Sequence, residues 1–353
     1  MNTLSTALKN FGWGRTIVFL FLVGLFVVGS FFGISPAGSL TDVLVRFGMN
    51  GILVLSMVPM IQSGCGLNFG VPVGIVAGLF GAVMSLELRL TGLAGVLVAI
   101  LIAAFSGAIL GMLYGMLLNK VKGDEMIIAT YVGLSFVFFM NILWMLLPFR
   151  NPSSVMGFKG EGLRVTISVE EYWIHVFNNF LKIQIGDKLV IPTGMLLVFA
   201  LMCLILWLFF KTKTGTAITA VGSNPEYARA AGININKMRL ISVMLSTLFA
   251  AVGIVVYQQS FGFIQLYNSA SFFTFPSIAA ILLGGASVNK ASIPNVIIGT
   301  ILFQGILTMT PTVINGAIQV DISEVLRPVI TYSLVVIALT RGTTVRGLAR
   351  KAR

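Results

Sequence analysis

Charged residues are scarce in this sequence. Asp, Glu, Lys and Arg make up 10% of the 353 residues, against about 25% in soluble globular domains, whereas 57% of the residues are hydrophobic. An ordinary soluble fold is therefore excluded. The uncharged stretches between ionisable residues, such as Arg89 to Lys120, are long enough for the about 20 residues that a helix needs to cross a bilayer. The sequence predicts an all-α, polytopic membrane protein.

Histidine and cysteine are almost absent. The only histidine, His175, has no neighbouring cysteine or histidine, so no metal site is expected, and Cys65 and Cys203 fall in or beside apolar stretches. The apolar stretches hold no paired carboxylates of the kind that proton-coupled carriers use. They also lack a combination of nucleophile, base and orienting group, so the chain is not expected to be an enzyme.

A phosphate-binding loop is missing as well. The nearest approach, residues 284–292, has no glycine before its lysine and lies between two apolar segments. No cofactor is therefore expected on this chain, and any ATP hydrolysis would need another chain.

Two uncharged stretches are too long for one helix, and each contains an interruption. Residues 63–70 are rich in glycine, and residues 260–271 are rich in polar and aromatic residues. Dividing both stretches predicts about ten transmembrane helices. The expected segments are 16–34, 43–61, 68–86, 93–118, 126–147, 193–210, 240–259, 272–286, 293–309 and 323–340.

The basic residues gather on one side of these spans. With ten spans, the two termini share a side, and the whole net charge of +12 falls on that side, whereas the other side is balanced. Since Lys and Arg accumulate in cytoplasmic loops, both termini are expected in the cytoplasm. The same asymmetry accounts for the basic pI without nucleic-acid binding.

This topology predicts a single membrane domain over residues 1–353. Its parts are a first membrane half (16–147), an extracytoplasmic loop (149–192), a cytoplasmic region (211–239) and a second membrane half (240–340). One interruption in each half is the pattern of two broken-helix repeats, as in inverted-repeat transporters. Glycines spaced four apart, such as Gly74 and Gly78, fit close helix packing within one bundle or at a dimer face.

The cytoplasmic region contains a short helix with its own start and stop signals. Asn224 can cap it, Pro225 suits the first turn, Glu226 suits the positive end of the helix dipole, and Gly232 can end it. Such a short helix needs support from neighbours. It could lie on its own bundle, or it could dock a partner through the small residues Ala228, Ala230, Ala231 and Gly232.

These residues resemble a known family, the permease subunits of ABC importers for simple sugars, nucleosides and branched-chain amino acids. Gly222, Asn224, Pro225, Glu226, Ala230, Ala231, Gly232 and Ile233 are similar to the family's ATPase-coupling motif, and residues 278–287 are similar to its second-half Gly-Gly turn. In the first half, Asn68 and Pro72 depart from the Gly-Ile-Asp-Leu-Ser-Val-Gly pattern frequent in relatives.

The resemblance implies a multi-pass protein of the bacterial inner membrane with several partners. These are ABC ATPase subunits carrying ATP and magnesium, a second permease that is the same or related, and an extracytoplasmic substrate-binding protein. Hinges are expected at the glycines of the two turns, Gly64, Gly66, Gly70, Gly284 and Gly285.

Uncharged polar side chains flank both interruptions and are candidates for the translocation pathway. They are Gln62, Asn68, Gln258, Gln259 and Asn268, with Phe69 beside them. Amides and aromatic rings suit a small neutral polar solute, a simple sugar or a nucleoside. Each amide could equally form an interhelical hydrogen bond. A permease for branched-chain amino acids or another small metabolite, and an ATP-independent carrier or channel, remain alternatives.

Overall fold

The computed structural model describes residues 13–121, 123–155, 162–186, 188–318 and 320–336. The first membrane half contains α2 (Trp13–Phe31), α3 (Pro36–Leu55), α4 (Met57–Gln62), α5 (Val71–Glu87), α6 (Gly92–Lys120) and α7 (Glu125–Leu146). The loop that follows contains β1 (Thr166–Ser168), α8 (Val176–Asn179), β2 (Ile183–Ile185) and β3 (Leu189–Ile191). Lys9 and the basic residues beyond residue 340, which are expected in the cytoplasm, lie outside the described residues. The end of the last predicted span, 323–340, also lies outside them.

The second half begins with α9 (Thr193–Lys211) and the two short helices α10 (Lys213–Ser223) and α11 (Pro225–Ala230). It continues with α12 (Ile235–Phe261), β4 (Phe263–Gln265), the 3₁₀ helix η1 (Tyr267–Phe273), α13 (Thr274–Leu283) and α14 (Ile293–Ile318), and residues 323–336 are also helical. Strand β1 pairs antiparallel with β4, and β2 with β3.

The fold is a bundle of apolar helices, as the sequence predicted. Among the described residues, six helical segments are long and apolar enough to cross a membrane: 36–62, Gly92–Lys120, Glu125–Leu146, Thr193–Lys211, Ile235–Phe261 and Ile293–Ile318. Three shorter apolar helices cover Arg15–Phe31, Val71–Glu87 and Tyr267–Leu283. The number of ten spans and the side of the termini remain predictions.

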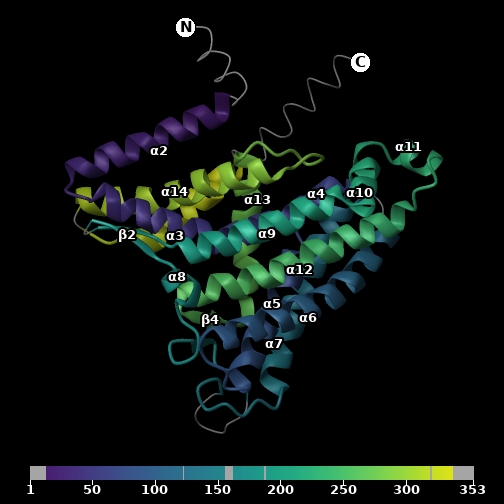
Figure 1. Ribbon diagram of the computed structural model, residues 1–353, viewed down its shortest axis with the longest axis horizontal. Helices are drawn as coiled ribbons and strands as arrows, with labels where there is room; N and C mark the ends of the chain where they lie inside the picture. The colour runs from purple at the N-terminus through teal and green to yellow at the C-terminus, as the bar shows by residue number, and fades with distance from the viewer. Residues whose placement is uncertain (1–12, 122, 156–161, 187, 319, 337–353) are drawn as a thin grey trace.

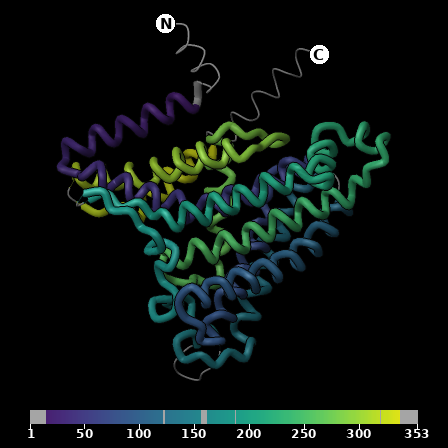
Figure 2. Tube along the Cα trace, in the orientation of Figure 1, coloured from purple at the N-terminus to yellow at the C-terminus, as the bar shows by residue number. Residues whose placement is uncertain are grey.

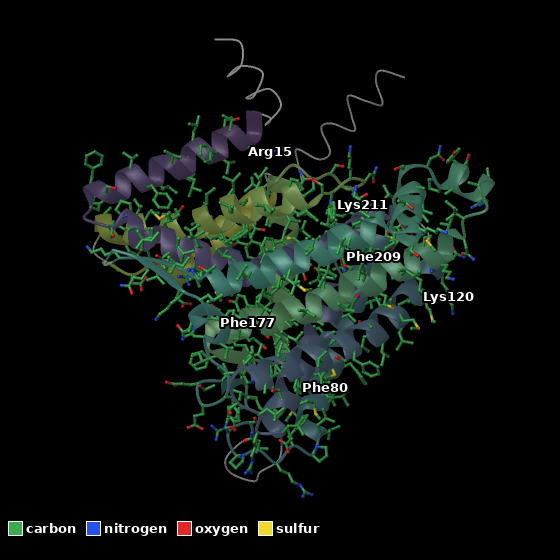
Figure 3. All side chains as sticks on the ribbon, in the orientation of Figure 1. Arg15, Phe80, Lys120, Phe177, Phe209 and Lys211 are labelled. Atoms are coloured by element: carbon green, nitrogen blue, oxygen red, sulfur yellow. The ribbon has the colours of Figure 1, made fainter. Side chains whose placement is uncertain are left out.

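The long helices run between two ends of the bundle (Figure 1). We call the end where α6 and α9 finish, at Lys120 and Lys211, the basic end (Figure 3). Helices α10 and α11 lie at this end (Figure 1). The opposite end, which carries β1 to β4 and α8, is the loop end. Phe177 of α8 marks it in Figure 3.

Helix α12 forms the centre of the bundle and packs against α3, α5 and α6, whereas α2 lies at an edge against α14 (Figure 2). Small residues allow the closest approach. A Cβ on Gly74 of α5 would lie 2.5 Å from the carbonyl oxygen of Thr247, and one on Gly111 of α6 would lie 2.8 Å from the Cα of Met244. Gly78, singled out in the sequence with Gly74, lies against the Ala251 carbonyl of α12, so both glycines lie in helix contacts within this bundle.

The two interruptions lie at opposite ends of the bundle. Residues 63–70 join α4 to α5 near the basic end, where Gly66 lies against Met126 in the first turn of α7. Residues 260–271 lie at the loop end, where β4 pairs with β1. Both segments therefore connect helices near the ends of the bundle.

Helix α3 begins earlier than the predicted span 43–61. Ser35 caps it by accepting a hydrogen bond from the Gly38 N–H at 3.4 Å, and Pro36 occupies the first turn. The charges of Asp42 and Arg46 marked the edge of the predicted span, but both residues lie inside the helix.

Candidate functional site

The short helix α11 forms with the start and stop signals that its sequence predicts. The Asn224 side chain accepts a hydrogen bond from the Tyr227 N–H at 3.0 Å, and Pro225 follows in the first turn. At the other end, Gly232 has φ +78°, which favours glycine, and the Ile233 N–H donates to the Ala228 carbonyl at 2.9 Å. These local bonds fix a short helix between α10 and α12.

Helix α11 has one face on the bundle and one face open. Ala228 is completely buried in an apolar cluster with Ile218, Val221 and Met238. This corrects the expectation that Ala228 belongs to an exposed face, because the residue fills the contact that supports the helix. Glu226, Ala230, Ala231 and Gly232 are exposed, and the side chain of Tyr227 is 68% exposed.

The end of α10 crosses the end of α4 at backbone distance. A Cβ on Gly222 would collide with the Gln62 carbonyl oxygen and lie 2.9 Å from the Gly64 nitrogen. Gly64 itself has φ +76°. Gly222 and Gly64 have no side chain at this crossing. The segment that carries α11 therefore lies directly on the connection between α4 and α5.

The second-half glycine turn lies at the same junction. The Gln62 amide nitrogen donates to the carbonyl of Ala291, and the Asn295 amide donates to the carbonyl of Gly284 at 2.8 Å. Gly285 has φ +86°. The structure thus brings the two predicted hinge turns and the predicted coupling region together at the basic end.

Asn68 is a completely buried centre of hydrogen bonds. Its oxygen accepts from the Gly70 N–H at 2.9 Å and from the Tyr114 hydroxyl at 3.1 Å, and its nitrogen donates to Ser246 at 2.8 Å. Ser246 in turn donates to the carbonyl of Ser56 at 2.6 Å. Asn68 therefore ties the α4–α5 connection to α6, α12 and the α3–α4 joint.

An ion pair that the sequence did not reveal lies next to this network. Arg239, at the start of α12, pairs with Glu125 at the start of α7 and donates to the sulfur of Cys65 at 3.2 Å. The side chains of Arg239 and Glu125 are 12% and 13% exposed. The sequence placed Arg239 among the charges bordering the membrane, because nothing local shows that α7 and α12 begin side by side.

The remaining pathway candidates lie apart from one another. Gln259 is buried and holds α8 by accepting from the Phe177 N–H at 3.1 Å, and Asn268 accepts from Asn141 at 3.0 Å. Gln258 is buried, and its side-chain oxygen makes no hydrogen bond among the described residues. Phe69 packs edge to face on Phe275, with ring centroids 6.1 Å apart.

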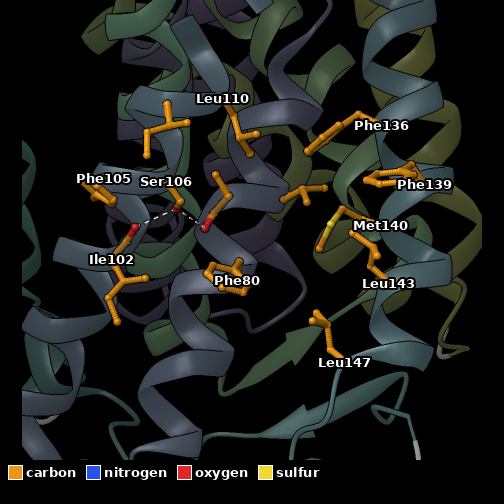
Figure 4. A pocket seen from close by; sticks show the side chains of 13 residues that line it. Phe80, Ile102, Phe105, Ser106, Leu110, Phe136, Phe139, Met140, Leu143 and Leu147 are labelled. Carbon is orange, nitrogen blue, oxygen red and sulfur yellow. Dashed lines mark hydrogen bonds between the residues drawn. The ribbon is translucent and has the colours of Figure 1, made fainter. Parts of the chain in front are cut away.

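A cavity of about 450 Å³ between α5, α6 and α7 is unsuited to a polar solute (Figure 4). Its one polar side chain, Ser106, donates to the Ile102 carbonyl at 2.7 Å. Phe105 and Phe139 on its wall are 71% and 54% exposed on the apolar surface of the bundle. A polar solute would lose its hydrogen bonds to water here without replacement.

A second cavity, of about 420 Å³, is polar and lies toward the loop end. It is formed by α3, α12, α14 and the helix 323–336, and it is lined by Asp42, Val45, Arg46, Met49, Asn50, Tyr257, Ser260, Phe261, Thr308, Thr312 and Arg327. None of these residues is among the six pathway candidates named from the sequence, Gln62, Asn68, Phe69, Gln258, Gln259 and Asn268. The available signal was the spacing of Asp42, Arg46 and Asn50, which places them on one face of a helix.

The helix that carries Arg327 is fixed to α14 by a polar connection. Asn315 of α14 donates to Asp321 at 2.9 Å, and the Ser323 N–H donates to the same carboxylate at 3.0 Å. The bond from the Ser323 backbone, followed by the other bonds to this group, holds the pKa of Asp321 below its usual value. One wall of the polar cavity is thus positioned by a local cap.

A family model described as "Branched-chain amino acid transport system / permease component" matches residues 39–339. The chain belongs to this family. The family resemblance is thereby confirmed, and the family is one of transport components and not of enzymes. No solved structure matches the chain.

Among its relatives are three permease proteins of bacteria. The chain is 27% identical to the probable ABC transporter permease protein YphD of Escherichia coli over 48% of its own length and 49% of the relative. It is 28% identical to the nucleoside ABC transporter permease protein NupB of Lactococcus lactis, over 43% of the chain and 41% of the relative. It is 32% identical to the guanosine ABC transporter permease protein NupQ of Bacillus subtilis, over 38% of the chain and 40% of the relative. In each case the chain spans less than half of the relative's length.

Proposed function

We propose that the chain is the membrane-spanning permease subunit of an ATP-driven ABC importer. The family match over residues 39–339 carries this proposal, and the exposed face of α11 supports it. Two ATPase subunits hold ATP and magnesium and bind the basic end through residues 224–232. Closing of the ATPases moves α10 against α4, and the helices then change between states open to one side of the membrane and to the other.

The transported solute is a small polar molecule, a simple sugar or a nucleoside, delivered by an extracytoplasmic binding protein at the loop end. Nucleoside and guanosine permeases among the relatives support this choice. A second permease subunit, identical or related, completes the membrane domain in the bacterial inner membrane. Both termini and α11 lie in the cytoplasm, where the positive-inside rule places the basic end.

Uptake into liposomes tests the function. The chain is reconstituted with the ABC ATPase and the binding protein of its importer, and entry of radiolabelled D-ribose and guanosine is measured with ATP, with ADP, and without the ATPase. Uptake that needs both the ATPase and ATP is expected. Entry of the solute through the chain alone, without ATP, would show instead a carrier or channel.

A further inference from the structure

The polar cavity contains charges that no part of the described protein neutralises by direct contact. The side chains of Asp42, Arg46 and Arg327 make no hydrogen bond and no ion pair within the described residues, although all three line the same space. The ion pair of Arg239 and Glu125 lies at the opposite end of the bundle and does not reach this cavity.

The depth of Arg46 makes this unusual. Arg46 is ten residues into α3, which at about 1.5 Å per residue is about 15 Å from the loop end, or about half of a 30 Å hydrocarbon core. A charged side chain at that depth is costly in lipid, and such residues face the bundle interior or a water-filled cavity and mark substrate pathways. Asp42 and Arg327 are exposed at the mouth of the cavity, whereas Thr308 is buried inside it. The cavity therefore opens at the loop end.

The free hydrogen-bonding groups of the cavity include both donors and acceptors. Arg46 and Arg327 can only donate, and Asp42 as a carboxylate can only accept. The hydroxyl hydrogens of Thr308 and Thr312 are given to the carbonyls of Gln304 and Thr308, at 2.7 and 2.8 Å, so their oxygens are left as acceptors.

Two further groups complete this set. The Asn50 nitrogen donates to the Arg46 carbonyl at 2.9 Å, which leaves the Asn50 oxygen as an acceptor. The ring of Phe261 lies beside that of Tyr257, with centroids 5.5 Å apart, and both rings line the cavity. An anion would satisfy the guanidinium groups and leave these acceptors unused. A solute with several hydroxyls satisfies both, because each hydroxyl donates and accepts.

We infer that this cavity is a binding site for a polyhydroxylated solute, either a sugar or the ribosyl part of a nucleoside. Arg46 and Arg327 donate to its hydroxyls, Asp42 and the threonine oxygens accept from them, and the rings of Tyr257 and Phe261 cover its apolar face. This inference rests on the proposed function. It adds the location of the binding site and the side chains that hydrogen-bond to the solute.

Protection of an engineered thiol tests the site without transport. Thr312 is exposed on the cavity wall, and Thr312→Cys places a thiol there in a Cys203→Ala background. The remaining Cys65 is only 3% exposed, so it should not react with the reagent. The modification rate by a water-soluble methanethiosulfonate is measured on the purified full chain in lipid nanodiscs. The probes are D-ribose, guanosine, L-leucine and inorganic phosphate, and the matched control is Lys182→Cys, exposed outside the cavity.

The inference expects D-ribose or guanosine to slow modification at position 312 at least threefold, with no effect at position 182. Leucine and phosphate are expected to leave both rates unchanged. The inference is overturned if neither D-ribose nor guanosine protects position 312. It is also overturned if phosphate or leucine protects as well as they do.

Uptake kinetics separate this inference from the proposed function. In the reconstituted importer, Asp42→Asn and Arg46→Gln are expected to raise the half-saturating concentration about tenfold, since each removes a charge-assisted hydrogen bond. Arg46→Lys should recover part of the loss, and Arg150→Gln, outside the cavity, should match the wild type. Wild-type uptake with unchanged kinetics in the Asp42 and Arg46 variants would overturn the site alone. Absence of ATP-dependent wild-type uptake despite protection at position 312 would overturn the proposed function alone.

Discussion

At the scale of single residues, Asn68 makes three buried hydrogen bonds near the basic end. Its oxygen is the acceptor for the buried Gly70 N–H and Tyr114 hydroxyl. Asn68→Ala leaves both donors without this acceptor, so we expect a loss of about 2–4 kcal/mol in the free energy of unfolding. Thermal unfolding of the purified chain in detergent measures the loss.

Asn119→Ala is the control for this prediction. Asn119 is also an amide at the basic end, but its hydrogen bond to the Asn236 carbonyl, at 2.8 Å, is exposed. Its loss should cost about 0.5–1 kcal/mol. Equal melting temperatures for the two variants would mean that the Asn68 network contributes no special stability.

Gly222 is the residue at which the predicted coupling region meets the end of α4. The added methyl group of Gly222→Ala would overlap the Gln62 carbonyl, so the backbones must separate. We expect a cost of about 1–3 kcal/mol and weaker ATP-dependent uptake, both measured on the reconstituted importer. Gly38→Ala is the control, because its Cβ would have no atom closer than 3.8 Å. Wild-type stability and uptake in Gly222→Ala would exclude a tight contact here.

At the scale of elements, the open face of α11 should bind the ATPase without contributing to the fold. Tyr227→Ala, Glu226→Arg and Ala231→Trp change exposed side chains, so the melting temperature should stay unchanged. Loss of the exposed aromatic ring should weaken ATPase binding about tenfold or more, as at other interface hot spots. Binding is measured by titrating ATPase onto the chain in nanodiscs, with Lys213→Ala on α10 as the control. Survival of tight binding and uptake in all three variants would refute docking on α11.

Which elements the sequence could predict depends on the range of the forces that form them. The caps of α11 and its glycine end are local, so Asn224 and Gly232 could be recognised within a few residues. The start of α3 was misplaced because Asp42 and Arg46 look like charges at a membrane boundary. Only the packing of α3 against α12 and α14 shows that they line a cavity.

Contacts between residues far apart in the chain could not be predicted from the sequence for the same reason. Asn68 and Ser246 are 178 residues apart, and Gln62 and Ala291 are 229 apart. The glycine turns were recognised as special backbone positions, yet their meeting at one junction follows from the fold. The pathway amides suited hydrogen bonding between helices as well as a solute, and Asn68 and Gln259 are engaged in such bonds.

At the scale of the whole molecule, two helical segments join the two candidate sites. The segment of α3 and α4 carries Arg46 in the polar cavity and Gln62 at the junction with α10. Helix α12 carries Tyr257 in the cavity and Arg239 beside the Asn68 network. Movement of either segment at the basic end would therefore reach the cavity directly, which is the arrangement that ATP-driven transport needs.

This arrangement requires the basic end to face the cytoplasm, and labelling of single cysteines checks it. In a Cys203→Ala background, Ser223→Cys marks α10 and Lys182→Cys marks the loop end, and both positions are exposed. A membrane-impermeant maleimide should label position 182 but not 223 in intact cells, and position 223 but not 182 in inside-out vesicles. The background chain, in which Cys65 is buried, should stay unlabelled in both. The reverse pattern would place α11 where no ATPase can reach it. Labelling of both positions from the same side would contradict the separation of the two ends by the bilayer.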